Sequence, residues 1–369
     1  MALKQYERHE PCNLKLFTPG PVIVPDYLLK ELALPNDTHR NAWYSELQES
    51  VEEQAKRLMY TKNDVLTFIS SGTGAMEACM SNLLDGDEPG LVLSCGAFGN
   101  RWHQIGQGLG KNVDKYKIPD GTAFRADKVK EWLDKKDYRI VCIEANETSA
   151  GVMNKMEEIA PVVKDTGALL CVDAVSALGG LKVEVDKLKI DVCLGSTQKA
   201  LALPAGLAIA AVSDEAFEKA ERTKNRGYYF DMVELRKKML AKHQTPTTGP
   251  IHTLRALDIS LNHILDVEGL ENCFARHRRM ANMVKGWANG RGYEMVPDPG
   301  YESPTVSAIR RPEGMVTLDF VKQMIDRGYR IVNGYGDLRN KSFRIGHMGA
   351  LMPDDIGELL GVMDDVLDK

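Results

Sequence analysis

Short, almost wholly apolar runs recur along this chain and constrain its fold more than any other feature. They are VLTFIS at 65–70, GLVLS at 90–94, RIVCI at 139–143, ALLCVD at 168–173, IDVCLG at 190–195 and LAIAAV at 207–212. Helical or loop stretches separate most of them. Buried strands of this kind, alternating with helices, are what a parallel sheet covered on both faces requires. We therefore predict an α/β core.

One strand-to-helix unit can be followed in detail. The run at 65–70 leads into Gly72, Thr73 and Gly74, and the apolar residues beyond recur at helical spacing. Gly86 would end this helix. The residues on its apolar face are Met76, Cys79, Met80, Leu83 and Leu84.

The pattern changes near Leu254, where a long helical stretch begins that includes LENCFARHRRMANMVKGWANG. A chain of 369 residues is also longer than one ordinary core. We expect an N-terminal arm at 1–17, a large domain at 18–255 and a smaller C-terminal α/β domain at 256–369.

Composition narrows the class of protein. Hydrophobic residues make up 43% and charged residues 27% of the chain, as in a globular protein, and the net charge of -5 gives no reason to expect a nucleic-acid partner. The N-terminus lacks an apolar signal region, and the apolar stretch at 200–212 is broken by Pro204, so we expect no membrane partner and a cytoplasmic location.

The cysteines indicate reduced core thiols. Seven is an odd number, several lie inside apolar runs, and no CxxC pair occurs, so neither a disulfide framework nor a structural zinc site is expected. They are Cys12, Cys79, Cys95, Cys142, Cys171, Cys193 and Cys273.

The strongest local signal is GSTQKA at 195–200, which follows the strand IDVCL and places Lys199 at its C-terminal end. Open α/β sheets bind ligands at that edge. An apolar setting disfavours the ammonium form of a lysine and leaves an amine able to form a Schiff base. The alternative is an ordinary surface lysine.

Asp173 ends another apolar strand and opens DAVSALGG, where a buried carboxylate needs a cation or several donors. Opposite pyridoxal phosphate it would keep the ring nitrogen protonated and make the ring an electron sink. A helix or turn cap is the alternative.

The turn ISSGTGAME suits a phosphate. Gly72 lets the backbone approach an anion, the first helical amides point at it, and Ser71 and Thr73 add hydroxyls. The turn is neither a Walker A loop nor a GxGxxG fingerprint, and such turns also begin helices that bind nothing.

Two further residues are candidates. Phe98 lies just beyond the strand GLVLS, where its ring could stack on a flat cofactor or simply belong to the core. Arg344, in SFRIGHMG, could hold a carboxylate bidentately or form a structural salt bridge.

Together these segments resemble the class V aminotransferases, specifically the alanine/serine:glyoxylate aminotransferase branch. The resemblance begins at LFTPGP near residue 16 and covers nearly the whole chain. It rests on seven motifs in register: SSGTGAMEA, GAFGNR, NETSAGV, VDAVSALGG, GSTQKAL, TPTTGP and FRIGHMG.

The resemblance implies the fold type I arrangement of pyridoxal-phosphate enzymes, with a mostly parallel seven-stranded sheet, a smaller C-terminal domain and a homodimer whose active sites lie at the subunit interface. Lys199 and Asp173 would be catalytic. Arg344 would bind the substrate's α-carboxylate, and Asn333 to Gly336 in VNGYG would line the same pocket. The remaining cofactor-binding residues would be Ser71, Gly72, Thr73, Phe98, Thr148 or Ser149, Val175, Gln198 and, from the neighbouring subunit, Thr248.

The same resemblance implies transamination, with Lys199 moving a proton as general base and then acid, in a ping-pong sequence. A lyase of the desulfurase type would need a cysteine on a mobile C-terminal loop, and none follows Cys273. A non-catalytic scaffold or a nucleotide-binding protein explains the retained residues less well. Alanine or serine with glyoxylate or pyruvate is the expected substrate pair, and a ureido or phosphonate donor is the alternative.

Overall fold

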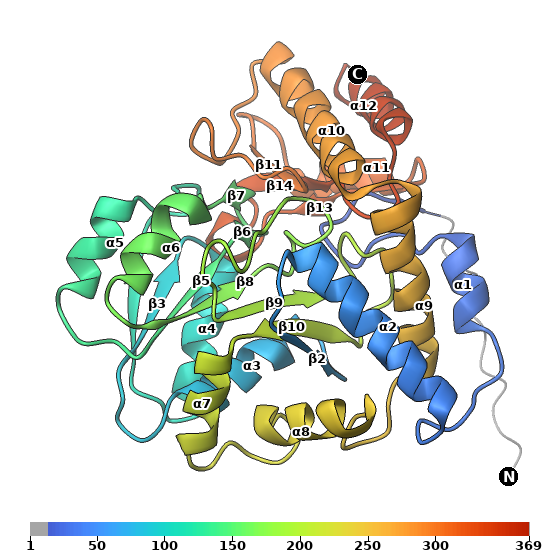
Figure 1. Cartoon of the computed structure of the whole chain (residues 1–369). Helices are drawn as coiled ribbons and strands as arrows, with labels where there is room; N and C mark the ends of the chain where they lie inside the picture. The colour runs from blue at the N-terminus through green and yellow to red at the C-terminus, as the bar shows by residue number, and fades with distance from the viewer. Residues whose placement is uncertain (1–13, 369) are drawn as a thin grey trace, which may run out of the picture.

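A computed structural model describes residues 14–368 and places a twisted sheet at the centre of the molecule (Figure 1). Its order is β2-β10-β9-β8-β5-β3-β4, and all neighbouring strands are parallel except β10, which runs antiparallel to both β2 and β9. The predicted α/β core with a mostly parallel sheet of seven strands is confirmed. The strands are β2 (Asp64–Phe68), β3 (Gly90–Ser94), β4 (Val113–Lys117), β5 (Ile140–Glu144), β8 (Leu169–Asp173), β9 (Val192–Ser196) and β10 (Ala208–Val212).

The six apolar runs all form strands, within one or two residues of the predicted bounds. The seventh strand, β4, has the sequence VDKYK and was not predicted. It lies at the edge of the sheet, where its side chains are half-buried or exposed, so no apolar run marks it.

Alternating side chains of the central strands feed two cores, one on each face of the sheet. On one face they pack against α2 (Ala42–Met59), α5 (Ala126–Leu133), α6 (Met156–Lys164) and α9 (Ile251–Asn262). On the other face they pack against α3 (Gly72–Leu83), α4 (Ala97–Gly108), α7 (Asp214–Arg222) and α8 (Met232–Lys242).

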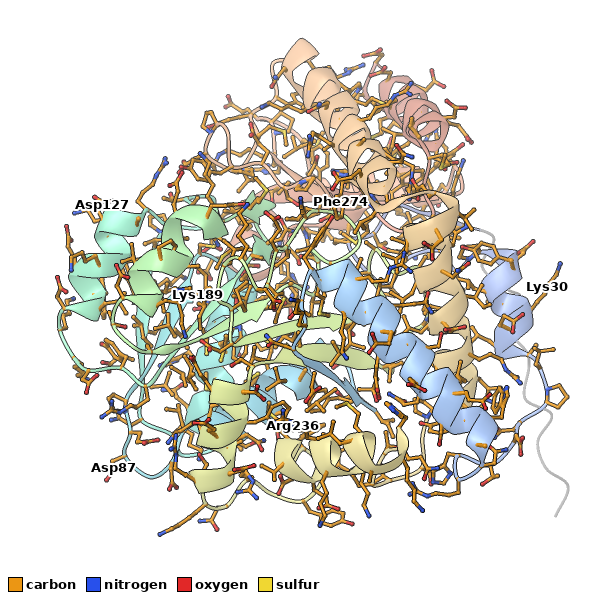
Figure 2. The ribbon with its side chains drawn as sticks, in the orientation of Figure 1. Lys30, Asp87, Asp127, Lys189, Arg236 and Phe274 are labelled. Carbon is orange, nitrogen blue, oxygen red and sulfur yellow. The ribbon has the colours of Figure 1, made fainter. Side chains whose placement is uncertain are left out.

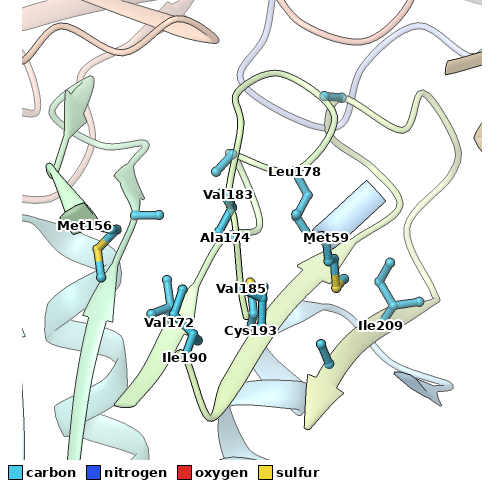
Figure 3. Close-up of a cluster of buried hydrophobic side chains, with 14 of the residues drawn as sticks. Met59, Met156, Val172, Ala174, Leu178, Val183, Val185, Ile190, Cys193 and Ile209 are labelled. Carbon is cyan, nitrogen blue, oxygen red and sulfur yellow. The ribbon is translucent and has the colours of Figure 1, made fainter. Parts of the chain in front are cut away.

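The core on the α2 face also includes the segment that joins β8 to β9. Figure 3 shows Val172, Cys193 and Ile209 on three strands of the sheet, with Val185 beside Cys193 and Met59 between Cys193 and Ile209. This packing fixes the ends of β8 and β9, the two strands that lead to Asp173 and Lys199.

The C-terminal part lies against the upper edge of this sheet (Figure 1) and is built on the sheet β11-β14-β13, with a third core of its own. Phe274, at the base of α10, faces the large part of the molecule (Figure 2). The elements are α10 (Leu270–Gly290), β11 (Val306–Arg310), α11 (Thr317–Ile325), β12 (Tyr329–Arg330), β13 (Val332–Asn333), a 3-10 turn (Gly336–Leu338), β14 (Ser342–Gly346) and α12 (Pro353–Leu367).

The N-terminal segment joins this C-terminal part. β1 (Lys15–Leu16) pairs in parallel with β12, and Phe17 belongs to the third core. The chain then crosses to the large part through α1 (Asp26–Leu32). Residues 1–13 of the predicted arm lie outside the described residues.

The expected boundary at residue 255 falls inside α9, which packs along α1 and α2 and buries Leu254, Leu257 and Leu261. A π-helical turn (His263–Val267) joins α9 to α10. We propose that the division between the two parts follows α9.

Helix α3 ends at Leu83, three residues before the predicted end at Gly86. Gly86 belongs to the following turn, where it has a φ of +51°. Six cysteines are free and buried, as predicted, while Cys12 lies outside the described residues. Within residues 14–368, no helix combines the length and apolar character that crossing a membrane requires.

We predict that Leu170→Ala lowers the free energy of unfolding by about 2–5 kcal/mol, because it leaves a cavity beneath the central strand β8. Leu170 is fully buried, whereas Leu240 on α8 is 62% exposed and provides a matched control. Urea unfolding of Leu170→Ala and Leu240→Ala measures both, and equal midpoints would contradict this account of the core.

Candidate active site

A cavity of about 420 Å³ opens at the carboxyl ends of the central strands, where the two parts of the chain meet. Most of the predicted site residues form its walls. These are Ser71, Gly72, Thr73, Phe98, Thr148, Asp173, Val175, Gln198, Lys199 and Arg344. The cavity therefore brings together residues from six of the seven motifs of the sequence.

Lys199 follows β9 directly and is only 6% exposed. The pKa of its amine is lowered to about 8, chiefly by burial and also by the charges of Arg344 and Arg101. The charge of Asp173 opposes this shift. Its Nζ donates to the carbonyl of Pro19 in the N-terminal segment. An amine in this state is readily deprotonated and can act as a nucleophile or a base.

A glycine at residue 20 makes room for that lysine. A Cβ there would lie 2.6 Å from Cδ of Lys199, and the φ of +100° also favours glycine. Pro19, Gly20 and Pro21 thus form one wall of the cavity.

Asp173 is the last residue of β8 and is almost fully buried. Burial raises the pKa of its carboxyl to about 6, although the N–H of Val175 donates to Oδ1 at 2.8 Å and the charge of Lys199 opposes the rise. A cationic ring nitrogen beside this carboxylate would stabilise its ionised form.

The turn at the start of α3 offers an anion site. Ser71 is exposed and makes no side-chain bond to the helix, so its hydroxyl is free to contact a ligand. A side chain at Gly72 would force Val175 to move, because a Cβ would lie 2.5 Å from Cγ2 of Val175. Gln198 lies on the same cavity wall and accepts from Ser196 Oγ at 2.5 Å.

A buried carboxylate, Glu147, holds the segment that carries Phe98. Its Oε2 accepts from the N–H groups of Phe98 and Gly99 at 2.9 and 3.1 Å, so it caps the N-terminus of α4. Its Oε1 accepts from the backbone and hydroxyl of Ser149 at 2.9 and 2.6 Å. A Cβ at Gly96 would lie 2.5 Å from the Glu147 side chain, so these two segments fit closely.

Arg344 lies on β14 and reaches the cavity from the C-terminal part. Its Nη1 donates to the carbonyl of Thr148 at 3.2 Å and its Nε to the carbonyl of Asn333 at 3.3 Å. Burial lowers the pKa of the guanidinium to about 10, and Glu147 opposes this. A carboxylate that entered the cavity would therefore meet a charged, oriented fork.

Three predicted residues do not line the cavity of this chain. Ser149 directs its hydroxyl to Glu147 and accepts from the N–H of Ala97, whereas the neighbouring Thr148 lies on the cavity wall. The Asn333 side chain bonds to Asn340. Thr248 is exposed on the surface, so any contribution from it has to be made to another subunit.

Other residues of the cavity were not predicted individually. They are Pro19, Gly20, Pro21, Met76, Arg101, Ala205, Val332 and Tyr335. Arg101 follows Phe98 by three residues on α4, so helical spacing would have placed both on one face. Tyr335 stacks on Phe98 with the ring centroids 5.9 Å apart.

A second cavity of the same volume lies between α10 and the segments around Met153 and Gly180. Lys285 at its rim is paired with Glu302 at 2.5 Å. Neither Lys199 nor Asp173 lines it. The cavity at the sheet edge, which holds both residues, is therefore the candidate active site.

The groups at the sheet edge fit pyridoxal 5′-phosphate. Lys199 is an amine for its aldehyde, Asp173 an acid for its ring nitrogen, Phe98 a ring to stack on it, and the start of α3 a site for its phosphate. Fold and site together define a fold type I enzyme of the pyridoxal-phosphate-dependent group.

Comparison with known proteins gives the family. The aminotransferase class-V model matches residues 24–321, and the chain belongs to the class V aminotransferases. It is 37% identical over 338 residues to an uncharacterized aminotransferase of Methanocaldococcus jannaschii, covering 90% of this chain and 87% of that one. It is 33% identical to an L-aspartate–glyoxylate aminotransferase of Paracoccus denitrificans, covering 91% of this chain and 86% of that one.

Among solved structures, an alanine–glyoxylate aminotransferase from Nostoc sp. superposes with a TM-score of 0.94 at 26% identity, covering 98% of this chain and 97% of that one. The chain is accordingly an aminotransferase, and its cofactor is pyridoxal 5′-phosphate.

We predict a pH-dependent difference in stability between the cofactor-free protein and its Asp173→Asn variant. Because the folded pKa of Asp173 is raised from 3.8 to about 6, folding is favoured by protonation, and this contribution is present below pH 4 and lost as pH rises through 6. The variant should gain about 3 kcal/mol relative to the parent between pH 4 and pH 7. Urea midpoints across this range measure the gain, and a constant difference would refute it.

Proposed function

We propose that this aminotransferase moves an amino group from a small amino acid of the alanine or serine type to glyoxylate or pyruvate, by a ping-pong mechanism. The observation that carries the proposal is the placing of Arg344 and Lys199 on one cavity, so that a single carboxylate clamp faces a single reactive amine. The alanine–glyoxylate and aspartate–glyoxylate relatives support glyoxylate as the acceptor.

The residues divide the work between binding and proton transfer. Arg344 holds the α-carboxylate of the donor and so fixes which face of its Cα is presented to Lys199. The bound cofactor supplies an aldehyde that takes up the amino group and a ring that withdraws electrons from Cα. Lys199 removes the proton from Cα of the donor and, in the second half-reaction, returns one to Cα of the product.

Asp173 and Phe98 would hold the cofactor's ring, with the carboxylate at the ring nitrogen and Phe98 against the face of the ring. The carboxylate of Asp173 is fixed by the N–H of Val175, and the backbone of Phe98 is fixed by Glu147. We propose that Ser71, Gly72, Thr73 and Gln198 contact the phosphate, and that Thr148 lies beside the ring. In a homodimer, the exposed Thr248 would reach the phosphate of the neighbouring subunit.

The structure gives no support to a cysteine-dependent lyase. Cys273 lies on α10, burial raises the pKa of its thiol to about 12, and the thiol donates to the carbonyl of Gly179. No cysteine of the described residues lines the cavity. A ureido or phosphonate amino acid is the second candidate class of donor. We also propose that the enzyme is cytoplasmic and has no nucleic-acid or membrane partner.

We predict that Lys199→Ala lowers amino transfer by about 100- to 10,000-fold or more, because no other amine of the cavity can take the Cα proton. Single amino acids are added to the purified, cofactor-loaded protein, and the change in cofactor absorbance is followed for alanine, serine, ureidoglycine and a phosphonate donor. Lys30→Ala, on the exposed surface of α1, is the control (Figure 2). Normal transfer by Lys199→Ala would overturn the mechanism, and conversion by the last two donors alone would replace the proposed substrates.

We predict that Arg344→Lys raises KM for both the amino acid and the 2-oxo acid by roughly 10- to 100-fold, because a charged hydrogen-bond fork worth about 1.5–3 kcal/mol is lost. The value of kcat should change less. Arg310→Lys is the matched control, since Arg310 lies on the neighbouring strand β11 and is exposed. An unchanged KM would show that another group binds the carboxylate.

A further inference from the structure

Arg101 is a second guanidinium in the active-site cavity, and the reaction described above does not use it. It lies on α4, one turn after Phe98, and its side chain is half-buried in the cavity wall. A cation in such a place is costly to keep unless something compensates its charge. The groups that surround the Arg101 guanidinium therefore indicate which kind of ligand it binds.

The partners that hold Arg101 are all neutral. Its Nη1 donates to Thr73 Oγ1 at 3.2 Å and its Nη2 to the Tyr335 hydroxyl at 3.3 Å. The guanidinium also lies over the ring of Phe98, 4.6 Å from its centroid. Among residues 14–368, no aspartate or glutamate forms an ion pair with it. These contacts orient the fork without giving it a direct ion pair, and its charge acts on the Asp173 carboxylate, whose pKa it lowers.

Arg344 is held in the same manner, by the carbonyl groups of Thr148 and Asn333. Tyr335 lies between the two arginines, since its ring centroid is 5.6 Å from the Arg344 guanidinium carbon and its hydroxyl accepts from Arg101. One α-carboxylate accounts for Arg344. A second oriented guanidinium on the same cavity calls for a second oxyanion.

We propose that Arg101 binds a second oxyanion in the cavity. This inference rests on the proposed aminotransferase function and extends it. The oxyanion has two possible sources. One is the side-chain carboxylate of a dicarboxylic substrate whose α-carboxylate is on Arg344. The other is the cofactor's phosphate, because Thr73 belongs to the first turn of α3. The two sources are separated by removing one anionic group at a time.

The first experiment tests the phosphate. Cofactor-free protein is titrated with pyridoxal phosphate and with pyridoxal, which lacks the phosphate, and binding is followed by quenching of intrinsic fluorescence. If Arg101 binds the phosphate, Arg101→Met weakens pyridoxal phosphate binding about tenfold or more and leaves pyridoxal binding unchanged.

The second experiment tests the carboxylate without requiring transfer. Calorimetry measures the binding of succinate and of propionate, which has one carboxylate fewer, to the cofactor-loaded protein. If Arg101 binds a side-chain carboxylate, the parent prefers succinate, and Arg101→Met loses about tenfold of that preference while Arg101→Lys keeps part of it.

The matched control is Arg255→Met. Arg255 lies 4.9 Å over the ring of Trp43, donates to the Pro35 carbonyl and is outside the cavity, so it shares the stacked, neutral setting of Arg101. The proposal is overturned if Arg101→Met changes neither ratio more than this control does, or if it weakens both members of each pair equally. Failure of every amino donor to change cofactor absorbance would instead refute the proposed function, and both binding experiments would still decide the role of Arg101.

Discussion

Burial of an amine and an acid at one edge of a sheet is the constraint on which the rest of this structure depends. Water cannot solvate Lys199 or Asp173 fully, so the pKa of each is shifted toward neutral pH and each can exchange a proton with a ligand more readily. Strands β8 and β9 bring the two together because they are parallel neighbours that end at the same edge. The apolar packing on both faces of the sheet keeps those ends in place.

The negative charge of Glu147 lies behind the cavity wall, whereas the positive charges of Arg344 and Arg101 line the cavity itself. Glu147 lies behind the wall, where four donors fully occupy its carboxylate, and its negative charge supports Arg344. The guanidinium groups of Arg344 and Arg101 line the cavity, and their hydrogen bonds go to neutral oxygens alone. The hydrogen-bond acceptors of the Glu147 carboxylate are thus all occupied within the protein. The two guanidinium groups form no ion pair within the described part of the chain and can still bind an anionic ligand.

The sequence could predict what local patterns encode, and no more. The apolar runs gave the central strands, and the residues that follow them gave Lys199 and Asp173. The strand β4 was missed because its exposed edge position needs no apolar run, and Glu147 was missed because its role depends on a segment some 50 residues away. The domain boundary expected at residue 255 stays a prediction. It lies inside α9, where helical periodicity continues and no change in the local sequence pattern marks a division.

The segment at residues 15–21 links the lysine to the far part of the molecule. Its strand β1 pairs in parallel with β12, and Phe17 is buried among C-terminal side chains. Two residues later the carbonyl of Pro19 accepts a hydrogen bond from Lys199. Because this short segment is fixed at one end to the C-terminal part and at the other to the lysine, any displacement of that part would also move the carbonyl group that Lys199 bonds to. The packing of the C-terminal part and the hydrogen bonding of the reactive amine are therefore coupled through the backbone of residues 15–21.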